Sequence, residues 1–191
     1  MTETIQAQGS RVDGFVDDGL AVGTLVLGIP VVGNASWLAA QPPRLVALGL
    51  GDNRRREEVA ALLEAQGHTL GTFIHPTAWI SPTATLGAGT VALPRVVVHT
   101  EARVGRGVIL NTGCIVEHEC IVGDFAHVSP AATLGGGALV GRRSHIGIGA
   151  TVLHLARVGD DCVVGGGAVV LKELASGLTA VGVPARPLAR R

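Results

Sequence analysis

Residues 109–134 read ILNTGCIVEHECIVGDFAHVSPAATL, a stretch in which every sixth residue, starting at Leu110, is aliphatic. The same phase runs without a slip from Ile74 to Val170 and covers 17 positions, of which 16 are Ile, Leu or Val. The exception is Ala92. A repeat held for so long indicates an architecture in which each unit stacks on the next.

The residues between the aliphatic positions indicate how the chain turns. A small residue such as Cys114 or Ala126 lies four places after most of them, and glycine often follows directly, as at Gly123. Residues two apart on a strand face the same side, so the small residue and the next aliphatic residue both point inward. We expect glycine to take the tight corner. Three hexads then close one triangular coil of 18 residues.

The three cysteines, Cys114, Cys120 and Cys162, all take the small inward position. We therefore expect them to pack in the core, with no nucleophilic or metal-binding role. An odd and sparse set of cysteines also argues against a disulfide framework and favours a reducing compartment.

This repeat resembles that of the hexapeptide-repeat proteins, whose fold is a left-handed parallel β-helix. The resemblance, rather than the spacing, implies the left hand. It extends over residues 73–174, and the tail GVPARP (182–187) is similar to the family's exit from the helix. We predict a mainly β protein with two domains. A truncated, Rossmann-like α/β domain that binds a nucleotide sugar spans 1–71, and a β-helix acyltransferase domain with its tail spans 72–191.

Many residues that point outward from the three flat faces are aliphatic. Sorted by the 18-residue period, the columns are Trp79, Val97, Ile115, Thr133, Thr151 and Val169; Thr85, Arg103, Ile121, Leu139 and Arg157; and Val91, Ile109, His127, His145 and Val163. A single chain in water should not expose so much apolar surface. Contact with copies of the same chain in a closed ring would bury these apolar side chains. The family resemblance implies a homotrimer.

Two histidines differ from the others in their surroundings. His118 lies at a corner between Glu117 and Glu119, and His127 lies on the flat face opposite that corner. A carboxylate beside an imidazole can hold its orientation and stabilise the cation that forms on proton uptake. Because a face is on the order of 10 Å wide, an active site that used both histidines would be shared between chains. The spacing alone leaves a catalytic and a structural role open.

Around these histidines, residues 111–130 closely resemble the sialic-acid O-acetyltransferase-like family, which includes bacterial N-acetyltransferases of nucleotide-linked 4-amino-4,6-dideoxy sugars. The resemblance implies acetyl-CoA as co-substrate, His118 as the general base and Glu119 as the residue that orients it. The amine would attack the thioester directly, without a covalent enzyme intermediate. The neighbouring chain would supply His127. The implied acetyl-CoA groove is lined by Asn111, His127, Gly136, Ile148 and Gly166.

The N-terminal third of the chain reads as a small α/β unit. The pattern predicts strands at Arg11–Val16, Pro30–Val32 and Leu45–Leu50, and a helix at Asn53–Gln66 with Gly67 as its C-cap.

Three segments of this unit, FVDD (15–18), GIPVVG (28–33) and LGDNRRR (50–56), resemble the family's nucleotide-sugar domain. The resemblance implies acceptor-binding roles for Asp17, Asp18, Asn53 and Arg56. Family members open with a strand and a G-x-G-G-H-G turn that approaches the nucleotide phosphates. This chain begins downstream of that turn, so we expect a shortened acceptor domain.

Composition and charge narrow the range of partners. The 15 basic and 15 acidic side chains balance to zero, which argues against nucleic acid or an acidic membrane as the main partner. The long uncharged stretch Gly19–Pro43 is interrupted by glycine and proline, so no membrane span is predicted. The N-terminus, MTETIQAQGS, lacks the pattern of a signal peptide, and we expect a cytoplasmic protein.

Two other functions remain compatible with the pattern, and a third conflicts with it. A sugar O-acetyltransferase would differ only in the acceptor atom. A zinc-dependent lyase of the carbonic anhydrase kind needs three histidines, two of them spaced H-x-x-x-x-H, and the sequence lacks this spacing. His127 and His145 stack one coil apart, but two ligands are too few, so no metal is expected. A catalytically impaired trimeric scaffold would bind coenzyme A without turnover.

Overall fold

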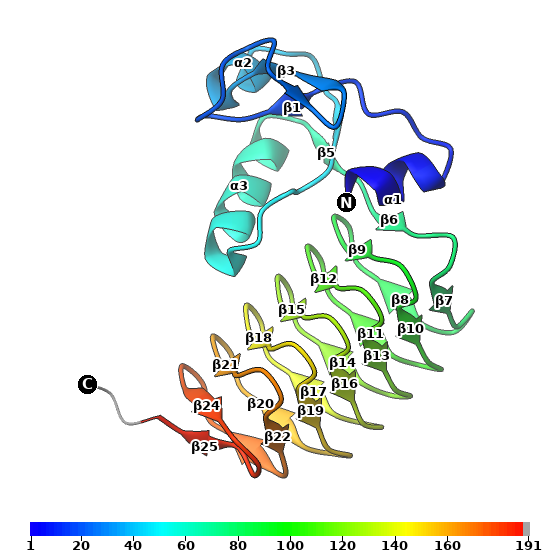
Figure 1. The fold of residues 1–191 in the computed structure, drawn as a ribbon, viewed down its shortest axis with the longest axis vertical. Coiled ribbons are helices and arrows are strands. Elements are labelled where there is room, and N and C mark those ends of the chain that lie inside the picture. Colours follow the sequence, from blue (N-terminus) through cyan, green and yellow to red (C-terminus); the bar gives the residue numbers. More distant parts are fainter. Residues whose placement is uncertain (189–191) are drawn as a thin grey trace.

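The computed structural model of the protein describes residues 1–188. It contains an N-terminal unit (residues 1–71) that lies at one end of a left-handed parallel β-helix and extends helix α3 (Asn53–Ala65) along its side (Figure 1). The predicted boundary between residues 71 and 72 falls between β5 (Thr69–Leu70) and β6 (Phe73–Ile74). The last three residues of the predicted second domain, 189–191, lie outside the described residues.

Each of the 17 predicted aliphatic positions is the second residue of a two-residue strand. These strands are β6, β7 (Trp79–Ile80), β8 (Thr85–Leu86), β9 (Val91–Ala92), β10 (Val97–Val98), β11 (Arg103–Val104), β12 (Ile109–Leu110), β13 (Ile115–Val116), β14 (Ile121–Val122), β15 (His127–Val128), β16 (Thr133–Leu134), β17 (Leu139–Val140), β18 (His145–Ile146), β19 (Thr151–Val152), β20 (Arg157–Val158), β21 (Val163–Val164) and β22 (Val169–Val170). The prediction of the repeat is confirmed.

Together with β23 (Glu173–Leu174), β24 (Thr179–Val181) and β25 (Arg186–Pro187), these strands form three sheets, one for each face of the helix, in which only the β24–β25 pair is antiparallel. The strand orders are β22-β19-β16-β13-β10-β7, β23-β20-β17-β14-β11-β8 and β25-β24-β21-β18-β15-β12-β9-β6. Partners are offset by one 18-residue coil, as in the pair Ile115 and Thr133. The outward columns therefore match the prediction. The inward small residues are buried beyond the first coil, and Cys114, Cys120 and Cys162 are fully buried.

The helix closes with β23 (Glu173–Leu174), β24 (Thr179–Val181) and β25 (Arg186–Pro187). The predicted exit GVPARP (182–187) connects β24 to β25, which pair antiparallel. An antiparallel partner covers the last strand of its sheet and so shields an edge that another chain could otherwise extend.

Glycine has a different role in the coils from the one predicted. The glycine after each aliphatic residue does not adopt a left-handed backbone; that conformation falls two residues later, at Gly107 (φ 60°) and also at Glu119 (φ 59°). At Gly123, a Cβ atom would lie 2.6 Å from the backbone N of Arg142 in the next coil. The corner interpretation is therefore wrong, and this glycine is needed because successive coils approach closely.

We predict that Gly123→Ala destabilises the protein by about 1–3 kcal/mol, because the new methyl group meets backbone atoms that cannot rotate away. Gly49→Ala is the matched control, since nothing lies within 4 Å of its added Cβ and its φ is not positive. Urea unfolding at equal protein concentration measures both. Equal urea midpoints for the two variants would show that successive coils can move apart enough to accommodate the added methyl group.

The N-terminal unit contains three helices and five short strands among the described residues. They are α1 (Thr2–Ala7), β1 (Phe15–Val16), β2 (Leu25–Val26), β3 (Ile29–Gly33), α2 (Ala35–Ala39), β4 (Leu45–Val46), α3 (Asn53–Ala65) and β5. Strands β1, β3 and β2 form one small sheet, and β4 pairs with β5 in parallel. Within residues 1–188, none of the helices is long and apolar enough to cross a bilayer.

Most elements predicted in this unit are present, although two are shorter. The predicted strand Arg11–Val16 is reduced to β1, and Leu45–Leu50 is reduced to β4. The predicted helix is α3, whose C-cap is Gln66, followed by Gly67 with φ of 86°. Helix α1 packs Ile5 against the first coils of the β-helix.

The unit is fixed to the β-helix by one aromatic side chain and several ion pairs. Phe125, at a corner of the coils, is buried within the apolar core of the unit. Ion pairs then run along α3: Arg54–Asp161 at 3.0 Å, Arg143–Glu57 at 2.7 Å, Arg106–Glu64 at 2.5 Å, and Arg142–Glu57. Arg142 and Arg143 are thus engaged with carboxylates of the same chain.

Candidate active site

His118 lies at the corner between β13 and β14, with its side chain 53% exposed. Its Nδ1 lies 3.0 Å from Oε2 of Glu119, the next residue. Because a carboxylate can only accept, this contact holds the proton on Nδ1 and leaves Nε2 as the basic atom. The corner backbone, with Glu119 at φ 59°, turns the carboxylate toward the ring.

Gly136 lies one coil below His118, and its lack of a side chain makes room for the imidazole. A Cβ on Gly136 would lie 2.5 Å from Nε2 of His118. The Gly136 N–H has no acceptor within residues 1–188, although the neighbouring Gly137 N–H donates to the His118 carbonyl at 2.8 Å. A buried backbone donor without a partner is rare, and beside a basic nitrogen it can stabilise a developing oxyanion.

His154 is a supporting residue that the sequence analysis did not single out. Its Nδ1 donates to the Gly136 carbonyl at 2.7 Å, which also accepts from Leu155 N–H at 3.0 Å. His154 therefore helps to fix the Gly136–Gly137 peptide, which directly follows the free Gly136 N–H. The signal was present in the sequence, because His118, Gly136 and His154 are spaced by 18 residues. A shallow pocket of about 330 Å³ continues from His154 along the same corner.

His127 belongs to a second group of polar residues on the face that contains β15 and β18. Asn111 Nδ2 lies 3.1 Å from His127 Nε2, and the His127 and His145 rings lie 4.7 Å apart. Ser129 Oγ lies 2.8 Å from His145 Nε2. Burial, with further effects from His145 and the Arg56 cation, lowers the pKa of His127 to about 4. Burial and Arg56 also lower the pKa of His145.

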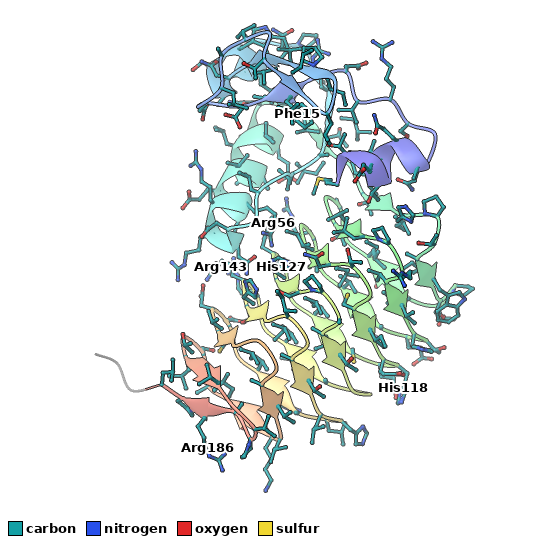
Figure 2. The ribbon with its side chains drawn as sticks, in the orientation of Figure 1. Phe15, Arg56, His118, His127, Arg143 and Arg186 are labelled. Carbon is teal, nitrogen blue, oxygen red and sulfur yellow. The ribbon has the colours of Figure 1, made fainter. Side chains whose placement is uncertain are left out.

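The two groups lie on opposite sides of one chain. Figure 2 shows His127 on the side that faces α3, whereas His118 lies on the far side of the β-helix. Ile148, which is 66% exposed, and Gly166 stack at a third position, the corner that follows β18. One chain therefore brings His118, Glu119 and Gly136 together, and separately brings Asn111 to His127.

The four predicted acceptor residues divide in a similar way. Asp17 and Asp18 are exposed, and their carboxylates accept backbone N–H groups of the unit itself at 2.8–3.0 Å. Asn53 and Arg56 turn instead toward the coils: Asn53 Nδ2 donates to the Arg143 carbonyl at 2.8 Å, and Arg56 is 1% exposed. The structure thus assigns Asn53 and Arg56 to the junction, and direct contact of Arg56 with a ligand would require this packing to open.

The three cysteine thiols are buried, and the described residues contain no cluster of metal ligands. Burial raises the pKa of Cys114 to about 12 and also raises that of Cys120, so these thiols remain protonated. Within residues 1–188, no three His, Cys, Asp or Glu side chains are grouped so that they could hold a metal ion.

A β-helix of hexads whose corner presents a histidine–glutamate pair beside a free backbone N–H defines a hexapeptide-repeat acyltransferase. The solved structures agree. A histidine-to-asparagine variant of perosamine N-acetyltransferase from Caulobacter crescentus, in complex with CoA and GDP-perosamine, is 35% identical with a TM-score of 0.94, covering 98% of this chain and 90% of that one. The chain belongs to this family of hexapeptide-repeat acetyltransferases.

Two further structures support the assignment. The acetyltransferase domain of PglB from Neisseria gonorrhoeae, in complex with acetyl coenzyme A, is 36% identical with a TM-score of 0.93, covering 98% of this chain and 92% of that one. WeeI from Acinetobacter baumannii is 27% identical with a TM-score of 0.81, covering 96% and 91%. A scan of protein-family models and a search of curated proteins each found no match.

Proposed function

We propose that the protein transfers the acetyl group of acetyl-CoA to the amine of a nucleotide-linked 4-amino-4,6-dideoxy sugar. The observation that carries the proposal is the His118–Glu119 pair, at 3.0 Å, with Nε2 of His118 against Gly136. The similar perosamine N-acetyltransferase, in complex with CoA and GDP-perosamine, supports this substrate class.

The chemistry needs one base and one oxyanion donor. His118 Nε2 accepts a proton from the acceptor amine as the amine nitrogen forms a bond to the thioester carbonyl carbon. The Gly136 N–H donates to the carbonyl oxygen as its negative charge develops. The C–S bond then breaks, and the imidazolium returns the proton to the leaving thiolate. Glu119 stabilises the imidazolium between these steps, and no thiol of the protein takes part.

We further propose that the working enzyme is a homotrimer whose active site combines His118 of one chain with Asn111 and His127 of the next. The separation of these groups within one chain supports the proposal. So do the outward apolar side chains on all three faces, because Trp79, Ile121 and Val163 are 50%, 45% and 43% exposed. Acetyl-CoA and reduced thiols are both present in the cytoplasm, where we expect the enzyme to work.

The first experiment measures thiol release from acetyl-CoA with UDP-, dTDP- and GDP-linked 4-amino sugars, and with the matching 4-hydroxy sugars. A reaction without acceptor corrects for background hydrolysis. Turnover with one amino sugar, and a product stable to hydroxylamine, would support N-acetylation. Turnover with a hydroxy sugar would identify an O-acetyltransferase. Coenzyme A binding in calorimetry without turnover on any acceptor would favour the scaffold alternative.

Co-expression of His118→Ala and His127→Ala chains tests the shared site. If each site takes His118 from one chain and His127 from another, random mixing leaves about a quarter of the sites intact, although each variant alone is inactive. Light scattering reports the trimer separately. A mixture no more active than its components would contradict the shared site.

A further inference from the structure

Arg56 is the most deeply buried charged residue at the junction between α3 and the coils (Figure 2). Its guanidinium makes six hydrogen bonds within the chain. The acceptors are the carbonyls of Gly107 at 2.7 Å, Leu50 at 3.0 Å, Gly51 at 3.3 Å, Phe125 at 2.7 Å and Ala126 at 3.2 Å, and Oδ1 of Asn53 at 2.8 Å. This one side chain therefore joins the loop before α3 to the coil that ends at His127.

All six acceptors are neutral. Within residues 1–188, no carboxylate lies within ion-pair distance of Arg56. The two glutamates nearby on the same helix are paired with other arginines: Glu57 with Arg142 and Arg143, and Glu64 with Arg106. Burial lowers the pKa of Arg56 to about 10, partly offset by the charge of Asp52, so the guanidinium is still a cation at neutral pH. A buried cation without a paired anion is costly and repels any further positive charge close to it.

Independent geometry indicates that His127 is neutral. Oδ1 of Asn111 accepts the Thr112 N–H at 2.8 Å, which fixes the amide and turns its NH₂ group toward His127 Nε2 at 3.1 Å. Because Nδ2 of an amide only donates, Nε2 must accept and cannot carry a proton. A cationic His127, with protons on both nitrogens, would lose this contact.

The charged groups around the histidine pair come from both elements that pack there. Helix α3 contributes Arg56 and Arg54, with Asp52 at its N-cap. Arg54 is paired with Asp161 at 3.0 Å. The coils contribute Arg143 and Asp161, which line a cavity of about 250 Å³ together with His145. Arg143 and Asp161 are paired with each other at 2.6 Å, so Arg56 is the cation without a carboxylate partner.

We propose that Arg56 is a positioning residue of the transferase: it fixes the backbone before His127, and its buried charge acts together with burial so that His127 meets the acetyl group as a neutral imidazole. The role of Arg56 in acetyl transfer rests on the proposed function. The protonation state of His127, in contrast, can be measured in the free enzyme. A neutral His127 keeps its contact with Asn111, so its ring stays fixed where a protonated ring would turn away.

NMR titration of the histidine side chains in the full-length enzyme, without acetyl-CoA or acceptor, tests the charge. The resonances are assigned with His127→Gln and His145→Gln. In the wild-type protein we expect His127 to remain neutral through pH 5.5 and His145 to titrate below its ordinary pKa. If either titrates near its ordinary pKa of about 6.5, the proposal is overturned, whatever the outcome of the acetyl transfer assay.

Arg56→Met removes the charge and the hydrogen bonds, and the pKa values of both histidines should then rise, although they should stay below 6.5 because burial, the larger cause of both shifts, remains. Arg106→Met is the control, because it breaks the Glu64 ion pair at the same helix and leaves Arg56 in place. The histidine titration of this variant should match the wild type.

The acetyl transfer assay tests the same charge through kinetics. Relative to the wild type, kcat of Arg56→Met should fall about tenfold per pH unit below the raised pKa of His127 and recover toward pH 8. A loss of activity equal at all pH values would assign Arg56 a structural role only.

Discussion

His118→Ala is expected to lower kcat for acetyl transfer by about 10²–10⁴-fold, the usual contribution of a general base. The side chain is 53% exposed, and within residues 1–188 its ring is hydrogen-bonded only to Glu119, so the fold should not depend on it. Coenzyme A affinity, measured by calorimetry, should change little because the base acts on the acceptor. Steady-state kinetics with the best acceptor of the panel gives kcat and KM separately.

His75→Ala is a suitable control for that experiment. His75 lies at the start of the first coil, where Nδ1 contacts Thr77 at 2.9 Å, and it belongs to neither polar group of the site. This variant should keep the wild-type rate. If His118→Ala keeps more than a tenth of the wild-type kcat, His118 is not the base, and the proposed mechanism fails even if the protein proves to be a transferase.

The fold of the β-helix was predictable because a strict period leaves few choices. Once Ile74 and Val170 are in one phase, an 18-residue coil fixes which residues pair, and the structure has Ile115 opposite Thr133 as the period requires. The role of glycine was not predictable in the same way. The pattern does not show whether a glycine serves a left-handed corner, as Gly107 does, or close backbone contact, as Gly123 does.

The site was predictable where the residues lie close in sequence. His118 and Glu119 are neighbours, so their contact needs only local geometry. The contacts of Arg56 were not predictable, because three of its six acceptors lie on coils more than 50 residues away, and their approach depends on how α3 packs. From the sequence alone, an arginine at the start of a helix is compatible with a ligand contact or with a buried packing contact, and only the tertiary structure distinguishes the two.

Gly136→Ala is expected to lower kcat by about 10²-fold, the effect of misplacing a reacting group by about 1 Å. The added Cβ would lie 2.5 Å from Nε2 and Cε1 of the His118 ring, which is a side chain that can rotate into solvent. The fold should therefore tolerate the methyl group, since the ring and not the backbone moves. The result should be a stable protein whose base points away from the acceptor amine.

Gly123→Ala is the comparison variant for this prediction, because it places the same methyl group 2.6 Å from a backbone atom rather than close to a side chain. The two variants should separate stability from catalysis. Gly123→Ala should unfold at lower urea concentration and keep kcat when folded, whereas Gly136→Ala should keep the wild-type urea midpoint and lose kcat. Gly136→Ala with a normal rate would mean that the His118 ring is productive in another position.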